Sequence, residues 1–220
     1  MRATAILRAG LVGALLVAGG TFVGTGTAHA VNPPGVASLG SAEFTKGNAE
    51  PISIPSIADC SVDGPTTNSS EVTARTGIAF GSGTTTCETT TIDAEKGITT
   101  TKSTAEGKNF ELSALVSARG PRIRIGSYTV TCSATQTLTE ASWSYEDASG
   151  LGTLPSPMPE RYVKPITKTD GTLLAEAIFN LRHLPGDGSV GLTMLQIKFA
   201  PPSGITGDVF VGRAACSPTP

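Results

Sequence analysis

Short runs of alternating apolar and polar residues, separated by turn sequences, are the feature that most constrains the fold of this chain. The alternation is clear in Leu195–Phe199 and in Phe210–Cys216, and it is typical of β-strands with one buried face. The turn sequences include VDGP, GSGT, ARGP, KTDG, PGDG and PPSG. Many short strands at this spacing indicate an all-β sandwich or barrel-like domain with antiparallel strands and at most one short helix.

Three further runs refine this expectation. Residues 72–80 and 110–118 each carry a set of apolar residues of one parity, and each set is expected to form one buried face. In residues 122–137, RIRIGSYTVTCSATQT, the apolar positions change parity around Gly126. This change predicts a bulge or tight turn there. The threonine-rich stretch GTTTCETTTIDAEKGITTTKST fits strands with a solvated face.

One segment supports two predictions. Residues 172–184, TLLAEAIFNLRHL, place Leu174, Ile178 and Leu181 on one helical face among good helix formers. The surrounding pattern favours a strand instead. Both predictions stay open on the sequence alone.

The first 30 residues have the pattern of a secretory signal peptide. Two arginines lie before an apolar run, and a small-residue cleavage pattern ends at Ala30. We expect cleavage before Val31, followed by a loose lead-in over residues 31–50 and a single β domain over residues 51–220.

Charge and hydropathy narrow the classes of partner. The chain has a formal charge of −2, and loss of the signal peptide would remove two arginines and no acids. No Lys/Arg cluster suggests nucleic-acid binding, and no basic amphipathic stretch suggests a membrane surface. No apolar run after residue 30 is long enough to span a bilayer. We therefore expect a secreted protein that is extracellular or loosely associated with the cell surface.

The four cysteines lie in the part of the chain that we expect to be exported: Cys60, Cys87, Cys132 and Cys216. An even number in such a chain indicates two disulfides. Three pairings are open, and the one most compatible with a sandwich joins the first cysteine to the second and the third to the fourth. With no C-x-x-C pair and His183 as the one histidine after residue 30, we expect no metal and no cofactor.

Several of these stretches also resemble a known family. The sequences RIRIGSYTVTCSATQT, TDGTLLAEAIF, VGLTMLQIKF and the terminal GDVFVGRAACS are similar to the choice-of-anchor P family of actinobacterial secreted proteins, over the C-terminal half of the chain. The chain departs from that family in LLAEAIF, where the family tends to have an asparagine before its glutamate, and we expect no C-terminal anchor. The resemblance implies a secreted, mostly β, disulfide-linked domain at or beyond the envelope, and it implies no catalysis.

Motifs for catalysis are missing from the sequence. The G-x-S-x-G elbow, the Walker loop, H-E-x-x-H and the EF-hand loop do not occur. His183 could complete a triad with Asp170 or Asp187 and a serine, and the carboxylates that a glycosidase would need are scattered: Glu140, Glu146, Asp147 and Glu160. We expect a non-enzymatic protein, with a secreted hydrolase, or a protease inhibitor using the loop at residues 154–162, as the alternative.

Trp143 and Tyr145 are the candidate contact residues. They share one face of an expected strand and stand beside a Pro/Gly-rich loop. Such a pair could stack on a sugar or pack against a protein, or it could fill the core. The expected partner is an envelope polysaccharide or another surface protein.

Overall fold

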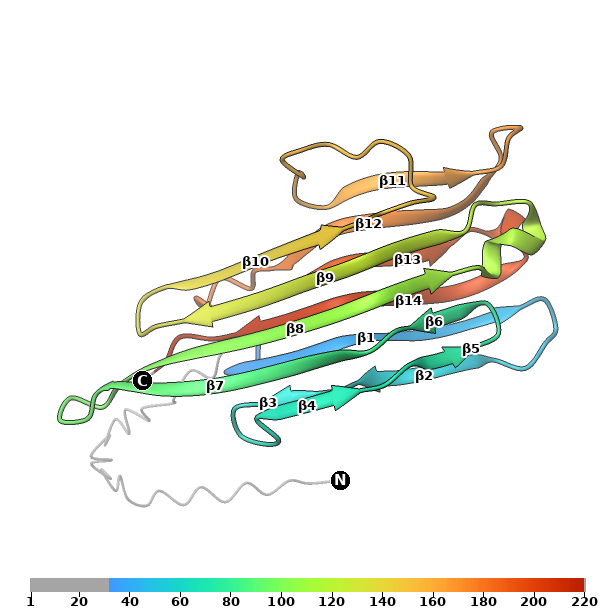
Figure 1. Ribbon diagram of the computed structural model, residues 1–220. Helices are drawn as coiled ribbons and strands as arrows, with labels where there is room; N and C mark the ends of the chain where they lie inside the picture. Colours follow the sequence, from blue (N-terminus) through green and yellow to red (C-terminus); the bar gives the residue numbers. More distant parts are fainter. Residues whose placement is uncertain (1–31, 220) are drawn as a thin grey trace, which may run out of the picture.

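The computed structural model describes residues 32–219, which form a sandwich of two seven-stranded antiparallel sheets (Figure 1). The predicted signal peptide, residues 1–30, lies outside the described residues. The elements in chain order are β1 (Gly35–Lys46), β2 (Ile52–Ile57), β3 (Cys60–Ser61), β4 (Thr67–Ser70), β5 (Thr73–Arg75), β6 (Ile78–Phe80), β7 (Gly83–Asp93), β8 (Ile98–Leu112), the 3-10 helix η1 (Ala114–Ala118), β9 (Ile123–Ala134), β10 (Thr139–Glu146), β11 (Tyr162–Thr167), β12 (Leu173–His183), β13 (Val190–Phe199), the 3-10 helix η2 (Pro201–Ser203) and β14 (Ile205–Cys216).

The two sheets are named here by their place in Figure 1. The back sheet has the strand order β11-β12-β13-β14-β1-β2, and β3 pairs with β1. The front sheet has the order β10-β9-β8-β6-β5, while β7 pairs with β8 and β4 with β7. This arrangement confirms the all-β sandwich expected from the alternation and the turns.

The core fills the space between the sheets. The rings of Phe44 and Phe199 lie 5.3 Å apart between centroids, and those of Phe80 and Phe110 lie 5.2 Å apart. The surface threonines behave as expected, because Thr89, Thr90 and Thr91 are exposed on a β7–β8 ribbon that extends beyond the other strands (Figure 1).

Both disulfides join one sheet to the other. Cys60 on β3 is bonded to Cys87 on β7, and Cys132 on β9 is bonded to Cys216 on β14, with S–S distances of 2.06 and 2.05 Å. The favoured pairing is confirmed. The bridges connect the two layers of the sandwich, so Cys132 is a structural cysteine.

The expectation of a loose lead-in over residues 31–50 is wrong. Residues 35–46 form β1, which lies between β14 and β2 inside the back sheet. The alternation of this strand is broken at Gly40, because Ala37 and Leu39 are buried before it and Ala42 after it. That break hides the strand from a simple period-2 search.

The structure of three other segments can be compared with the structure expected from sequence. Residues 173–183 form the strand β12, so tertiary context decides against the helix. Residues 72–80 are a short hairpin, β5–β6, in which Val72 is 67% exposed, so the expected continuous buried face is wrong there. The single buried strand face expected over residues 110–118 is also wrong, because β8 ends at Leu112, the 3-10 helix η1 follows, and Val116 is 45% exposed.

A row of left-handed or glycine residues crosses each sheet. In the front sheet the buried parity changes at Gly126, but the bulge or tight turn expected there is wrong, because β9 runs through Gly126 without a register shift against β8 or β10. The neighbours of Gly126 across the ladder, Asn109 and Asp147, have φ of 52° and 55°. In the back sheet Asn180 has φ of 54° and Gly212 has φ of 65°. Glycine, asparagine and aspartate tolerate this region best. Because the strands stay in register, each row reverses the buried parity of several strands together.

Candidate functional site

The aromatic edge consists of Trp143, Tyr145 and Phe179, at the side of the sandwich where β10 faces β12. The rings of Trp143 and Tyr145 stack with centroids 5.8 Å apart, and those of Trp143 and Phe179 with centroids 6.2 Å apart. Phe179 is fully buried, whereas Trp143 and Tyr145 are half-buried and pack against the core. The two predicted contact residues thus sit together, with part of each ring open to solvent.

A shallow depression of about 520 Å³ opens at the aromatic edge. Pro155 and Met158 border it from the loop before β11, and Asn180 and Arg182 border it from β12. Arg182 is held there, because its Nη2 donates to the carbonyl of Ala141 at 3.0 Å. Aromatic faces flanked by fixed polar groups are a combination that binding sites use for orientation and specificity.

The loop at residues 154–162, considered as an inhibitor loop, lies beside this edge. Leu154 and Met158 are half-buried and pack against the core. Two of its apolar side chains therefore point towards the sandwich rather than outward to a protease.

Two of the residues considered for a triad with His183 have another partner or lie far from it: Ser189 is hydrogen-bonded to Asp187, and Asp170 lies at the other end of β12. The hydroxyl of Ser189 donates to Asp187 at 2.6 Å and accepts from Asn32 Nδ2 at 3.0 Å, so its proton points at the carboxylate rather than at a base. Asp170 precedes β12 and His183 ends it, which separates them by about 35 Å of extended strand.

The scattered carboxylates do not form a glycosidase pair on β10. Glu140 and Glu146 are six residues apart on one strand, which is about 20 Å, against the roughly 5 to 10 Å that glycosidases use. Within residues 32–219 no group of three His, Cys, Asp or Glu side chains is placed to hold a metal ion.

Among residues 32–219, Glu111 on the front sheet is the one carboxylate that forms ion pairs with two arginines. Glu111 on β8 accepts from Arg124 Nε at 2.8 Å and also from Arg122. The hydrogen bond from Arg124, and then that from Arg122, lowers the pKa of Glu111. This exposed ion pair joins neighbouring strands and does not border the depression at the aromatic edge.

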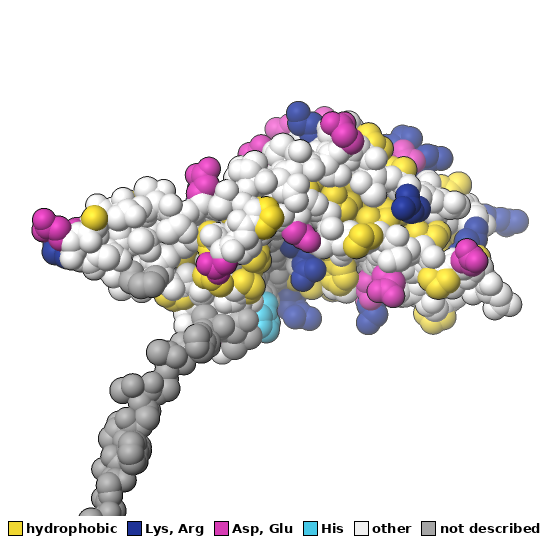
Figure 2. Space-filling view, turned by 90° about the horizontal axis from the view of Figure 1, so that it is seen from below, with side chains coloured by type: hydrophobic (Ala, Val, Ile, Leu, Met, Phe, Trp, Pro, Cys, Tyr) yellow, Lys and Arg dark blue, Asp and Glu magenta, His cyan; other side chains and the backbone are white. Residues whose placement is uncertain are grey.

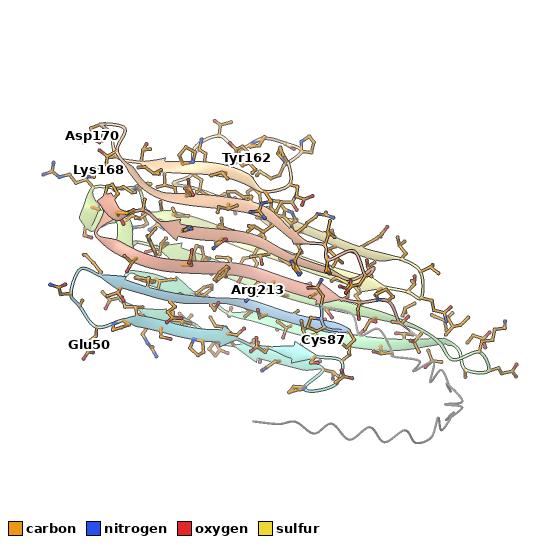
Figure 3. The ribbon with its side chains drawn as sticks, turned by 180° about the vertical axis from the view of Figure 1, so that it is seen from behind. Glu50, Cys87, Tyr162, Lys168, Asp170 and Arg213 are labelled. Atoms are coloured by element: carbon orange, nitrogen blue, oxygen red, sulfur yellow. A yellow bond between two sulfur atoms is a disulfide. The ribbon has the colours of Figure 1, made fainter. Side chains whose placement is uncertain are left out.

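A second concavity, of about 910 Å³, lies on the outer face of the back sheet. It is called the back-sheet groove here. Two rows of side chains line it, one residue from each of four neighbouring strands: Leu181, Thr193, Arg213 and Ser38, then His183, Gly191, Ala215 and Val36. Gly191 and Ala215 are small, so the second row is low in the middle, and the side chain of Asn32 lies over Gly191, where a Cβ atom would be 3.0 Å from Asn32 Oδ1. Figure 3 looks at this face and places Arg213 on it.

The charges along the back-sheet groove are mostly positive. Arg161, Arg182 and Arg213 line it with one carboxylate, Asp59, which accepts a hydrogen bond from Ser56. The guanidinium of Arg213 lies 5.3 Å from the ring centroid of Phe210. The ion pairs found within residues 32–219 involve neither Arg161 nor Arg213. Figure 2, which views the molecule from below along an edge of the sandwich, shows Lys and Arg side chains beside a hydrophobic area.

Sequence reasoning missed the groove. Arg161 and Arg213 are far apart in the chain, and no local motif marks either one. They share a surface because β11 and β14 belong to one sheet.

Comparison of the chain with protein-family models, with curated proteins and with solved structures finds no match. In the described part of the chain, no helix has the length and apolar character needed to traverse a bilayer.

Proposed function

We propose that the protein is a non-enzymatic β-sandwich domain that acts by contact at or outside the cell envelope, and that it binds envelope polysaccharide through Trp143 and Tyr145. The observation that carries the proposal is the half-open stack of these two rings beside a depression. An aromatic face presents a large rigid area to a sugar ring at low entropic cost.

Two further observations support the proposed location at or outside the cell envelope. Disulfides persist in oxidising compartments outside the cytoplasm, and all four cysteines are bridged. The N-terminal pattern that ends at Ala30 has the features of the signal peptide that directs export of such a protein. The resemblance to the choice-of-anchor P family agrees with both, and it remains a prediction.

The test uses the single tryptophan of the chain as a reporter. Titration of the exported protein with soluble fragments of envelope polysaccharide should change the fluorescence of Trp143. Trp143→Ala lacks this reporter, so its binding is measured by titration calorimetry beside the wild type. It should bind about two- to tenfold more weakly, since an aromatic stacking contact contributes about 0.5 to 1.5 kcal/mol.

Matched variants separate binding from folding. Trp143→Phe keeps an aromatic ring on Phe179, so it should fold and bind with intermediate strength, and Leu138→Ala, at an exposed side chain before β10, should bind as wild type. Unchanged binding by a folded Trp143→Ala variant would reject the aromatic edge as the site. A hydrolase activity that His183→Ala abolishes would reject the non-enzymatic function.

A further inference from the structure

We propose that the back-sheet groove binds an amphipathic anion that has a single acyl chain and a terminal carboxylate. This site is separate from the aromatic edge, because the groove opens on the outer face of one sheet and the edge opens between the sheets. Arg182 is the one residue that lines both concavities, and its guanidinium is already hydrogen-bonded to β10.

The floor of the groove suits a hydrocarbon chain. Leu181, Val36 and Ala215 contribute apolar surface, and the side chain of Asn32 borders this surface over Gly191. The low row between His183 and Val36 runs across four hydrogen-bonded strands, so the sheet fixes the spacing of these floor residues. The volume of about 910 Å³ lies within the range of sites that bury small ligands.

The charge of the groove selects an anion. Arg161 and Arg213 have no ion-pair partner within residues 32–219, while the one carboxylate of the lining, Asp59, is engaged by Ser56. A cationic or neutral head group would leave the arginine charges uncompensated. A carboxylate would neutralise the arginine charges and accept charge-assisted hydrogen bonds from the guanidinium groups.

Arg213 is the residue assigned to the carboxylate. Its guanidinium is oriented by the ring of Phe210, which reduces the entropy lost when it binds a planar anion. Arg213 and Ala215 are two residues apart on β14 and line the same groove. The guanidinium of Arg213 lies over Phe210, away from Ala215, so an acyl chain that extends from a carboxylate there towards Ala215 places its distal methylenes on the low floor.

Calorimetric titration of the exported protein with octanoate, decanoate and dodecanoate, each below its micelle concentration, tests the proposal. The dissociation constant should fall by about two- to fourfold for each added methylene, as expected for partial to full burial of the chain. Decanol and decyltrimethylammonium should bind at least tenfold more weakly than decanoate, because neither has a negative charge that neutralises the arginines.

Three variants locate the site. Arg213→Gln should weaken decanoate binding by about tenfold or more, and Ala215→Trp should abolish it by filling the low row. Arg75→Gln, on β5 of the front sheet, should bind as wild type. Thermal unfolding of each variant confirms that it is folded. If Ala215→Trp does not fold, Ala215→Leu, which introduces a smaller aliphatic side chain, replaces it.

Several results would overturn the proposal. These are no binding of decanoate by the wild type, equal binding of decanol and decanoate, or unchanged binding by both Arg213→Gln and the folded Ala215 variant. Burial of the groove by a second copy of the chain, seen as a dimer that Ala215→Trp dissociates and decanoate does not, would also reject it.

Discussion

Tyr128 is a polar side chain that crosses the core. Its hydroxyl donates to the carbonyl of Leu39 at 2.7 Å and so connects β9 of the front sheet to β1 of the back sheet. The ring lies against two glycines, and a Cβ atom at Gly107 would lie 2.2 Å from the Cζ atom of Tyr128. A side chain at Gly107 would displace the tyrosine, whereas one at Gly212 would first meet Val130, with its Cβ 2.6 Å from Val130 Cγ2.

Replacement of this tyrosine tests the buried hydrogen bond. Tyr128→Phe should lower the free energy of unfolding at neutral pH by about 1 to 2 kcal/mol, because the carbonyl of Leu39 loses its donor. Urea denaturation measures the change. A variant as stable as wild type would show that the hydroxyl contributes no net stability.

The same residue gives a dependence on pH. Burial raises the pKa of Tyr128, whereas a tyrosine in the unfolded chain titrates near pH 10. Above about pH 10 the unfolded chain loses this proton and the folded chain keeps it, so the stability falls as the pH rises. Tyr128→Phe should reduce that fall, and equal slopes in the two proteins between about pH 9 and pH 11 would contradict the assignment.

Among the elements, β12 shows how one residue changes the two faces of a strand. Asn180 takes φ of 54°, its backbone carbonyl accepts from the amide of Arg161, and its Nδ2 donates to Met158. Before it, Ala177 and Phe179 face the core. After it, Leu181 and His183 face the back-sheet groove.

Two variants at this position separate backbone strain from side-chain contacts. Asn180→Gly should cost less than about 1 kcal/mol, because glycine adopts positive φ freely. Asn180→Val should cost about 2 to 3 kcal/mol, because a β-branched residue is strained in that region. Equal losses for the two variants, measured by urea denaturation, would show that the side-chain hydrogen bonds rather than the backbone set the requirement.

Elements were predictable from sequence where alternation is unbroken. The strands around Ile197 and Val130 follow period 2. The sequence does not predict β1, because the buried parity of this strand reverses at Gly40. Segment 172–184 has helical propensity, but the strands on both sides of it, β11 and β13, supply hydrogen-bond partners that an isolated segment lacks. Neighbouring strands, rather than local preference, decide such segments.

At the scale of the whole molecule, the two disulfides join the layers and should differ in effect. Cys132 and Cys216 close a sequence separation of 84 residues, and Cys60 and Cys87 one of 27. In the chain-entropy model the longer closure stabilises by about 4 to 5 kcal/mol and the shorter by about 3 to 4 kcal/mol. Replacing both cysteines of the longer pair with serine should lower the melting temperature by about 10 to 15 °C.

Scanning calorimetry of the two double-serine variants gives the comparison. The variant that lacks the Cys60–Cys87 bridge should melt at the higher temperature of the two. The reverse order would mean that the denatured chain already restricts the longer loop, so that its closure adds less than the chain-entropy model assigns.

The class of fold and the favoured disulfide pairing followed from the sequence, because alternation, turn residues and cysteine spacing are local properties that specify strands and make one pairing suit a sandwich. The placement of Trp143 and Tyr145 on one strand face followed in the same way. Only the tertiary structure decided that β1 lies inside the back sheet and that Arg161, Arg213 and Ala215 line one groove. Those relations depend on which strands pair and in what register, and strand pairing joins residues whose separation along the chain carries no local signal.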